Sequence, residues 1–186
     1  LSTQALYGDY DKVYTNIFPA TAVRTATSGP LAGQQVIGIE AYADPTQRET
    51  LIGQANIEWR GDTGGIGHVL LLGAEYTSQD TDNARINGFW NPAVLTSAGR
   101  RTDIAFNRAP VIPPVTFVAG PTGNSNRAVR SELEQVSLYL QDQISLSDAV
   151  DVVAGIRYDR FDLSVTNRFT GTTASRTDDL WSPRLG

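Results

Sequence analysis

Residues 51–60 read Leu-Ile-Gly-Gln-Ala-Asn-Ile-Glu-Trp-Arg, and this stretch decides the fold. From position 53 onward, apolar or small residues alternate with Gln, Asn, Glu and Arg. A period of two is typical of a β-strand that has one apolar and one polar face. The glycine-rich stretch at 61–65 predicts a tight turn, because glycine readily adopts the positive φ that such turns need. The alternation resumes at 67–79, which we interpret as the returning strand.

The same pattern appears further along the chain. Residues 132–146 and 151–163 alternate in the same way and are separated by a short turn at 147–148. Residues 1–18 are rich in Tyr, Val and Thr and predict a strand that is irregular near 9–11. A short strand is expected at 34–43, inside a loop that begins at 19, and another strand begins at 180. The sequence therefore predicts an all-β fold of about six long antiparallel strands in up-and-down order.

The predicted connections alternate in length. They are short near 61–66 and 146–149, and long near 19–47, 80–130 and 164–179. Short turns at one end and long loops at the other are typical of an outer-membrane β-barrel. Trp59 lies near a short turn, whereas Tyr76 and Tyr158 lie nearer the long loops, as expected for two aromatic girdles. The polar strand faces suit a water-filled lumen better than a sandwich core; they carry Glu58, Arg60, Glu75, Arg157 and Asp159.

The composition narrows the choice of function. The 186 residues include no Cys and one His, and they contain no Gly-x-Ser-x-Gly nucleophile elbow, so we expect no enzyme. The net charge of -5 disfavours a nucleic-acid partner. The chain starts at Leu1, has no Met, and holds too few strands to close a barrel of useful width. We therefore expect residues 1–186 to be part of a larger barrel domain.

Several motifs resemble TonB-dependent siderophore receptors of the catecholate type. They are Tyr7-Gly8-Asp9-Tyr10-Asp11-Lys12, the stretch at 62–68 that runs into Leu72-Gly73-Ala74-Glu75-Tyr76, and Gln79-Asp80-Thr81-Asp82-Asn83. Leu138-Tyr139-Leu140-Gln141-Asp142-Gln143, Ala154-Gly155-Ile156-Arg157-Tyr158-Asp159 and Trp181-Ser182-Pro183-Arg184-Leu185-Gly186 follow in the order that this family uses. The resemblance covers most of the chain except the long loops.

The resemblance implies a 22-stranded barrel in the bacterial outer membrane, built around an N-terminal plug. It also implies uptake of a ferric siderophore, energised by TonB through the plug. The plug domain, the signal peptide and the C-terminal strands are expected to lie outside residues 1–186. The expected partners are the ferric siderophore, TonB and membrane lipid, and the expected state is a monomer. No resident cofactor is expected, because iron enters only as part of the substrate.

The long connection at 80–130 is the predicted ligand-binding segment. A ferric tris-catecholate is an anion with aromatic rings, which Arg can hydrogen-bond and aromatic side chains can pack against. The candidates in this segment are Arg85, Phe89, Trp90, Arg100, Arg101, Phe106 and Arg108. Tyr10 and Tyr14, near the outer end of the first strand, are further candidates by the same reasoning.

Other conspicuous residues have structural interpretations. We expect Arg157 and Asp159 to form a cross-strand ion pair in the barrel wall, worth about 0.2–1 kcal/mol. His68 is the only histidine, so it cannot form a multi-histidine metal site, and we expect it at the membrane interface. The Asp80-Thr81-Asp82-Asn83 stretch lacks the Gly and Glu spacing of a calcium loop, so no metal site is expected there.

Two other functions stay open at the level of sequence. One is a soluble carbohydrate-binding β-sandwich, in which Trp90 and tyrosines would stack on sugars. This alternative predicts a second sheet over one strand face. The other is a receptor of the same class that transports a vitamin or an oligosaccharide, a choice that depends on the loops alone.

Overall fold

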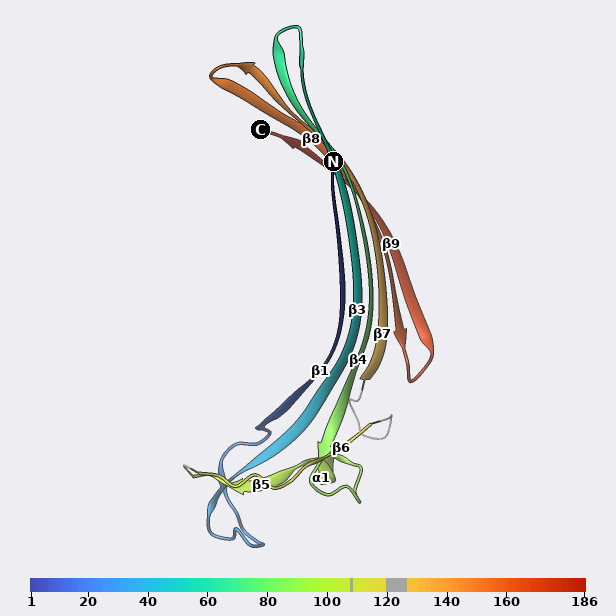
Figure 1. Cartoon of the computed structure of the whole chain (residues 1–186). Helices are drawn as coiled ribbons and strands as arrows, with labels where there is room; N and C mark the ends of the chain where they lie inside the picture. The colour runs from blue at the N-terminus through green and yellow to red at the C-terminus, as the bar shows by residue number, and fades with distance from the viewer. Residues whose placement is uncertain (108, 120–126) are drawn as a thin grey trace.

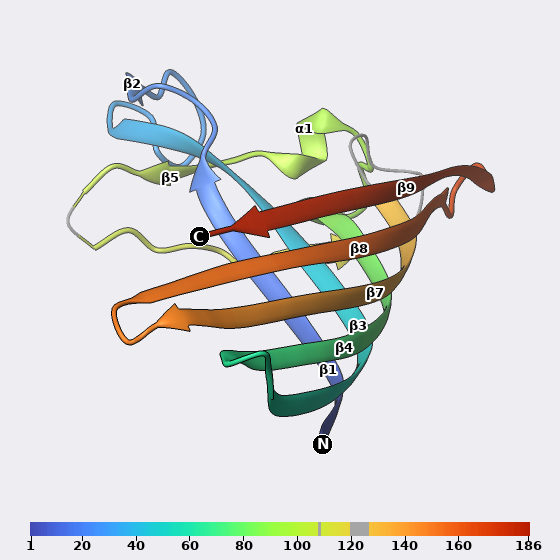
Figure 2. The same cartoon turned by 90° about the horizontal axis from the view of Figure 1, so that it is seen from above.

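A computed structural model describes residues 1–107, 109–119 and 127–186. Six long antiparallel strands form one curved sheet (Figures 1 and 2), in the spatial order β1-β3-β4-β7-β8-β9. Their bounds are β1 (Ser2–Pro19), β3 (Gln35–Thr63), β4 (Ile66–Phe89), β7 (Arg127–Ser147), β8 (Val150–Asn167) and β9 (Thr172–Leu185). The predicted up-and-down arrangement of six long strands is therefore confirmed.

Both predicted short turns are two-residue hairpin connections. Gly64 and Gly65, between β3 and β4, have φ values of 61° and 89°. Positive φ at both central positions is what a type I′ hairpin turn requires, and glycine meets this requirement without steric cost. Residues 148–149 make the equivalent connection between β7 and β8.

The strand predicted at 34–43 and the strand predicted at 51–60 are one strand, β3. Pro45 lies between the two predicted segments, and it lacks the N–H that a β-ladder needs. Pairing with β4 lapses at positions 44 and 45, but Ala43 pairs with Ile86 and Thr46 with Asn83, so the register is the same on both sides. The predicted irregularity at 9–11 is also wrong, because β1 pairs continuously with β3.

Two predicted loops were too long. β4 continues to Phe89 and β7 starts at Arg127, so the segment between them is shorter than the predicted 80–130. The connection predicted near 164–179 is confined to 168–171, because β8 continues to Asn167 and β9 starts at Thr172. Over most of these parts of the strands both faces are polar, so little apolar alternation marks them.

A small apolar core lies at the loop end of the sheet. Short strands β5 (Thr102–Ala105) and β2 (Arg24–Thr25) pair with β3, and β6 (Thr116–Val118) pairs with β4. The short helix α1 (Ser97–Arg100) lies beside β4 in this region. The most buried apolar side chains gather here and include Val36, Ile39, Phe89 and Ile104. The described loop segments that carry β2, β5 and β6 are thus folded against the outer ends of β3 and β4.

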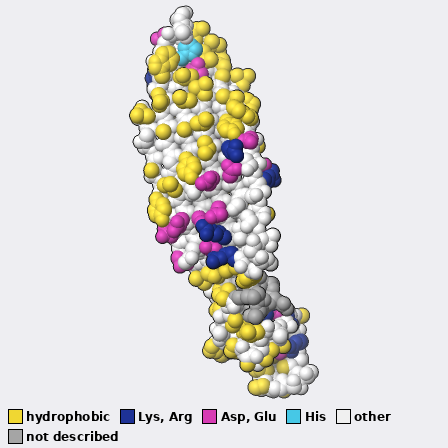
Figure 3. All heavy atoms as spheres, turned by 90° about the vertical axis from the view of Figure 1, so that its right-hand side faces the viewer, with side chains coloured by type: hydrophobic (Ala, Val, Ile, Leu, Met, Phe, Trp, Pro, Cys, Tyr) yellow, Lys and Arg dark blue, Asp and Glu magenta, His cyan; other side chains and the backbone are white. Residues whose placement is uncertain are grey.

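The convex face of the sheet carries a continuous apolar band over the half nearest the short turns (Figure 3). Leu72, Leu138 and Ile57 on this face are 50%, 51% and 53% exposed. Within the part of the chain that the structure describes, no second sheet covers this band. In a β-sandwich, a second sheet would cover one face of this sheet. The sandwich alternative is therefore wrong. We use the name apolar band for Leu51, Ile57, Trp59, Leu70, Leu72, Tyr76, Val136, Leu138, Leu140, Ile144, Ile156 and Tyr158.

Candidate functional site

The middle of the concave face carries a network of polar side chains that hydrogen-bond to one another. Arg157 Nε donates to both carboxylate oxygens of Asp159 at 2.9 and 3.0 Å, and Ser137 Oγ donates to Asp159 Oδ1 at 2.6 Å. Arg157 and Asp159 lie on the same strand, so the predicted pair is formed along β8 and its cross-strand links are to Ser137 and Glu75. Asp159 is buried, at 7% exposure, and its charge is compensated inside the wall.

An aromatic–arginine cluster lies at the loop end of the concave face. We define it as Tyr14, Phe18, Tyr42 and Arg85. The Tyr42 ring lies 6.2 Å from that of Tyr14 and 5.9 Å from that of Phe18, between ring centroids. Arg85 Cζ lies 3.9 Å above the Tyr42 ring, within cation–π distance. β1, β3 and β4 thus bring together side chains that are far apart in sequence.

Asp44 holds Arg85 in place. Arg85 Nε donates to Asp44 Oδ1 at 2.8 Å and Nη2 donates to Oδ2 at 2.5 Å, a bidentate pair. These hydrogen bonds keep the pKa of Asp44 below its ordinary value of 3.8 and raise the pKa of Arg85. Both groups lie on the strand segments beyond the apolar band, toward the loops. Arg85, predicted in a loop, is therefore a strand residue of the concave wall.

The pH dependence of this pair gives a first prediction. A folded-state pKa below the unfolded value adds stability above that value, and this stability is lost as the pH falls through the folded pKa. We expect Asp44→Asn to lower the unfolding free energy of the full-length protein by about 1–2 kcal/mol at pH 7. The difference in unfolding free energy between wild type and Asp44→Asn should shrink below pH 3.8, since Asp44 is then protonated in the unfolded state. Urea midpoints at pH 7 and pH 3 measure both values.

Asp9→Asn is the matched control for this prediction. Asp9 is a carboxylate on the convex face at the same end of the sheet, and no ion pair between described residues includes it. We expect little change in midpoint from this variant at either pH. A loss in Asp44→Asn that is equally large at pH 3 would contradict the ionic origin of the effect.

The loop arginines are held by one carboxylate. Arg101 Nη2 lies 2.6 Å from Glu40 Oε1, and Arg100 Nη2 lies 3.3 Å from Glu40 Oε2. The Glu40 side chain is only 14% exposed. Arg100 and Arg101, two of the predicted ligand-binding arginines, therefore join the loop to the outer end of β3.

The remaining ligand candidates are scattered. Phe89 lies at the end of β4 and is completely buried, so its ring packs in the small core. Trp90 Nε1 donates to Pro113 O at 3.1 Å. Phe106 is 58% exposed, whereas Arg108 lies outside the described residues. On β1, Tyr10 and Tyr14 are 41% and 55% exposed.

Sequence reasoning missed Tyr42 and Arg48. Arg48 Nε donates to Thr81 Oγ1 at 2.9 Å, and Arg48 Cζ lies 5.7 Å from the Tyr10 ring centroid. Tyr10, Arg48 and Thr81 are directly opposite one another on β1, β3 and β4. A continuous strand through 44–50 would have placed Arg48 beside Tyr10, but the sequence predicts a connection up to 47 and a strand only from 51.

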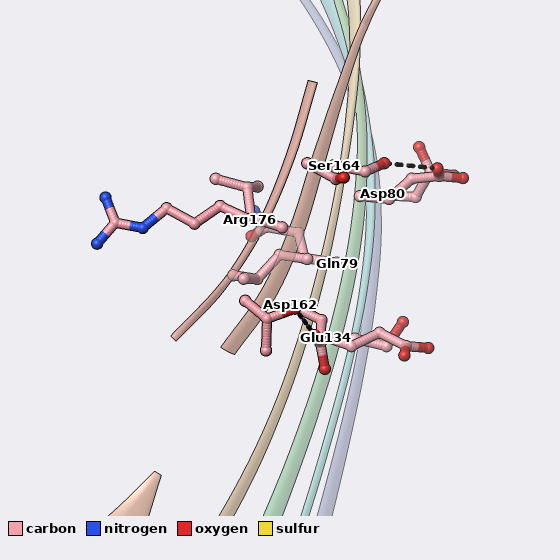
Figure 4. A pocket seen from close by; sticks show the side chains of 12 residues that line it. Gln79, Asp80, Glu134, Asp162, Ser164 and Arg176 are labelled. Atoms are coloured by element: carbon pink, nitrogen blue, oxygen red, sulfur yellow. Dashed lines mark hydrogen bonds between the residues drawn. The ribbon is translucent and has the colours of Figure 1, made fainter. Parts of the chain in front are cut away.

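The convex face beyond the apolar band carries a carboxylate belt. We define it as Asp9, Asp11, Glu49, Asp80, Asp82, Glu132, Glu134 and Asp162. Four of these, from Asp9 to Glu132, lie directly opposite one another on four neighbouring strands. Arg130 pairs with Asp80 and lies 3.0 Å from Glu132. Figure 4, a pocket over β4 and β7–β9, shows Asp80 and Glu134 extending to one side of the sheet and Arg176 to the other.

His68 has a partner that the sequence did not reveal. His68 Nδ1 lies 2.8 Å from Asp142 Oδ2, on the convex face near the short turns. Asp142, which interrupts the apolar alternation of β7, is thereby paired across the strands. Among the described residues no group of three or more His, Cys, Asp and Glu side chains could hold a metal ion. No helix in that part of the chain is long and apolar enough to cross a membrane.

The family model for the β-barrel of TonB-dependent receptor-like proteins matches residues 1–186. The chain belongs to the TonB-dependent receptor family. Barrels of this family lie in the outer membrane of Gram-negative bacteria, and its members are receptors and transporters rather than enzymes. The apolar band therefore faces the lipid of that membrane, and the concave face lines the barrel lumen.

Curated relatives and solved structures agree with this family. The metal-pseudopaline receptor CntO of Pseudomonas aeruginosa is 31% identical over 130 residues, which are 67% of this chain and 17% of that receptor. The siderophore receptor PiuA of Acinetobacter baumannii matches 96% of this chain and 29% of its own, with a TM-score of 0.59 and 16% identity. The unliganded ferric citrate transporter FecA matches 96% and 25%, with a TM-score of 0.54 and 14% identity.

The match covers only a small part of each relative. This chain spans 17% of the length of the curated relatives that it matches. At 14–16% identity, the two solved structures establish the likeness of fold alone. Together with the family model over residues 1–186, this likeness confirms that the sheet is a segment of a TonB-dependent receptor barrel.

Proposed function

We propose that this chain is part of the barrel wall of a TonB-dependent receptor that takes up a metal chelate, with a ferric siderophore as the substrate. TonB would supply the energy through a plug domain encoded elsewhere in the same protein. Similar proteins are described as a metal-pseudopaline receptor, a siderophore receptor and a ferric citrate transporter, and these descriptions support a metal chelate as the substrate class.

The aromatic–arginine cluster is the observation that carries this proposal. It offers a cation and three aromatic rings on the concave wall at the loop end, where a substrate arriving from outside would enter. Arg can make charge-assisted hydrogen bonds to an anionic chelate, and aromatic rings can pack against its organic groups. Of the predicted contacts, we propose Tyr10, Tyr14, Arg85 and Phe106 as substrate contacts. Arg100 and Arg101 would act by holding the loop on Glu40.

Transport by the full-length protein tests the proposal. Cells that carry or lack its gene would be given ⁵⁵Fe as a tris-catecholate, a trihydroxamate or a citrate complex, each in strains with and without TonB. We expect accumulation of at least one chelate to require both genes. Unchanged ⁵⁵Fe accumulation, together with loss of cobalamin or oligosaccharide uptake, would contradict the proposal and favour another substrate of this receptor class.

A further inference from the structure

The two faces of the sheet carry opposite charge beyond the apolar band. On the convex face, the carboxylate belt predominates over Arg130, Arg160 and Arg168. On the concave face, cations predominate over the carboxylates of Asp44 and Glu40; they are Lys12, Arg48, Arg85, Arg100, Arg101 and Arg127. The chain has a net charge of -5, yet most of its described acidic residues at this height lie on the convex face. Such an arrangement attracts anions toward the lumen.

Arg48 differs from the other arginines on the concave face of the long strands, Arg85 and Arg127. Arg85 and Arg127 both lie within 4.0 Å of Asp44, at 2.5 and 3.9 Å. No ion pair between described residues includes Arg48; its hydrogen bond to the buried Thr81 uses Nε only. The carboxylates nearest in register, Glu49 and Asp80, belong to the opposite face. The guanidinium charge of Arg48 is thus uncompensated within the described part of the wall.

The surroundings of Arg48 hold it ready for a ligand. The Thr81 hydrogen bond fixes one edge of the guanidinium, and the Tyr10 ring lies over it at 5.7 Å. A planar guanidinium held in this way loses little conformational entropy when it binds, and its two terminal nitrogens can donate in parallel to two oxygen atoms. This geometry suits a carboxylate, a catecholate or another oxyanion with two adjacent oxygens.

We propose that Arg48 is a specificity-determining residue that binds an anionic metal chelate through its terminal guanidinium nitrogens. The inference rests on the proposed uptake function. It adds that the substrate carries negative charge where it contacts Arg48. Thr81 is its positioning residue, and the ring of Tyr10, itself a proposed substrate contact, packs beside it. Arg85 would contribute less than Arg48 to the binding of an anion, because Asp44 already neutralises the charge of Arg85.

Arg48→Gln in the full-length protein tests this assignment, with Arg130→Gln as the matched control. Arg130 lies one register position away and loses the same charge, but on the convex face. The probes are ferric citrate and the ferric complex of 2,3-dihydroxybenzoate, both anionic, and a neutral ferric trihydroxamate. Affinity is measured by quenching of intrinsic fluorescence in detergent at several salt concentrations. We expect the affinity of Arg48→Gln for the anions that wild type binds to fall about tenfold, the effect of about 1.4 kcal/mol.

The outcomes separate this inference from the proposed function. Arg48→Gln should also bind anions with a weaker salt dependence, Arg48→Lys should recover part of the affinity, and the neutral chelate should change less than about twofold. Wild type that takes up no metal chelate would contradict the proposed function itself. Anion binding that is the same in wild type and Arg48→Gln would overturn only the role of Arg48. An equal loss for neutral and anionic chelates, or a lowered melting temperature alone, would assign Arg48 to wall structure and would also overturn it.

Discussion

Leu72→Arg is expected to destabilise the full-length barrel in lipid by about 2–4 kcal/mol, the cost of an arginine at the middle of the lipid-facing surface of a β-barrel. Leu72 is 50% exposed and lies directly opposite Ile57 and Leu140, in the centre of the apolar band. The new guanidinium would have to stay in hydrocarbon or draw water and headgroups inward. Urea titration of the protein folded into phospholipid vesicles measures the change.

Leu71→Arg is a stringent control, because it makes the same substitution one residue away. Leu71 belongs to the concave face, opposite Glu58 and Gln141, so an arginine there would meet polar groups and water. We expect a cost below about 1 kcal/mol, as for a surface substitution. Equal costs at positions 71 and 72 would mean that the two faces meet the same environment, and the assignment of the apolar band to lipid would fail.

The contrast between Leu71 and Leu72 also explains which parts of the fold could be predicted from the sequence. Apolar alternation arises where one strand face meets lipid and the other meets the lumen, so the segments at 51–60, 67–79, 132–146 and 151–163 were found correctly. Beyond the apolar band both faces meet water. The side chains of Asp80 and Thr81, for example, point to opposite faces of the sheet, but both are polar. The sequence therefore predicts loops at the outer ends of β4 and β9.

The candidate site was only partly predictable for a related reason. Tyr10, Tyr14 and Arg85 were found because aromatic and cationic residues are conspicuous in any segment. Arg100 and Arg101 lie about sixty residues from Glu40 in the sequence, and no local sequence pattern predicts that they pair with it. Arg48 was missed because the weak pattern around Pro45 hid the strand that carries it. Charge segregation between the faces becomes visible only once the register of β1, β3 and β4 is known.

Gly73 is a position where any side chain would create a sharp packing defect in the long strands. It lies directly opposite Tyr139, whose ring covers it, and a Cβ at this position would overlap Tyr139 Cε2 and Cζ and lie 2.5 Å from Asn56 Oδ1. The same tyrosine hydroxyl donates to Asn56 Oδ1 and accepts from Gln54 Nε2 at 2.9 Å. An aromatic ring laid over a cross-strand glycine is a known way to stabilise a sheet that a glycine would otherwise weaken.

Gly73→Val should therefore cost about 1–3 kcal/mol, because the side chain forces the Tyr139 ring off its place and breaks its hydrogen bonds. Gly53→Val is the control: nothing lies within 4 Å of a Cβ there, and valine favours strands, so we expect no loss. Adding Tyr139→Ala should relieve the overlap, so that the double variant Gly73→Val/Tyr139→Ala loses less than the sum of its single changes. Additive losses in this cycle would show that Gly73 is needed for backbone freedom rather than for the ring above it.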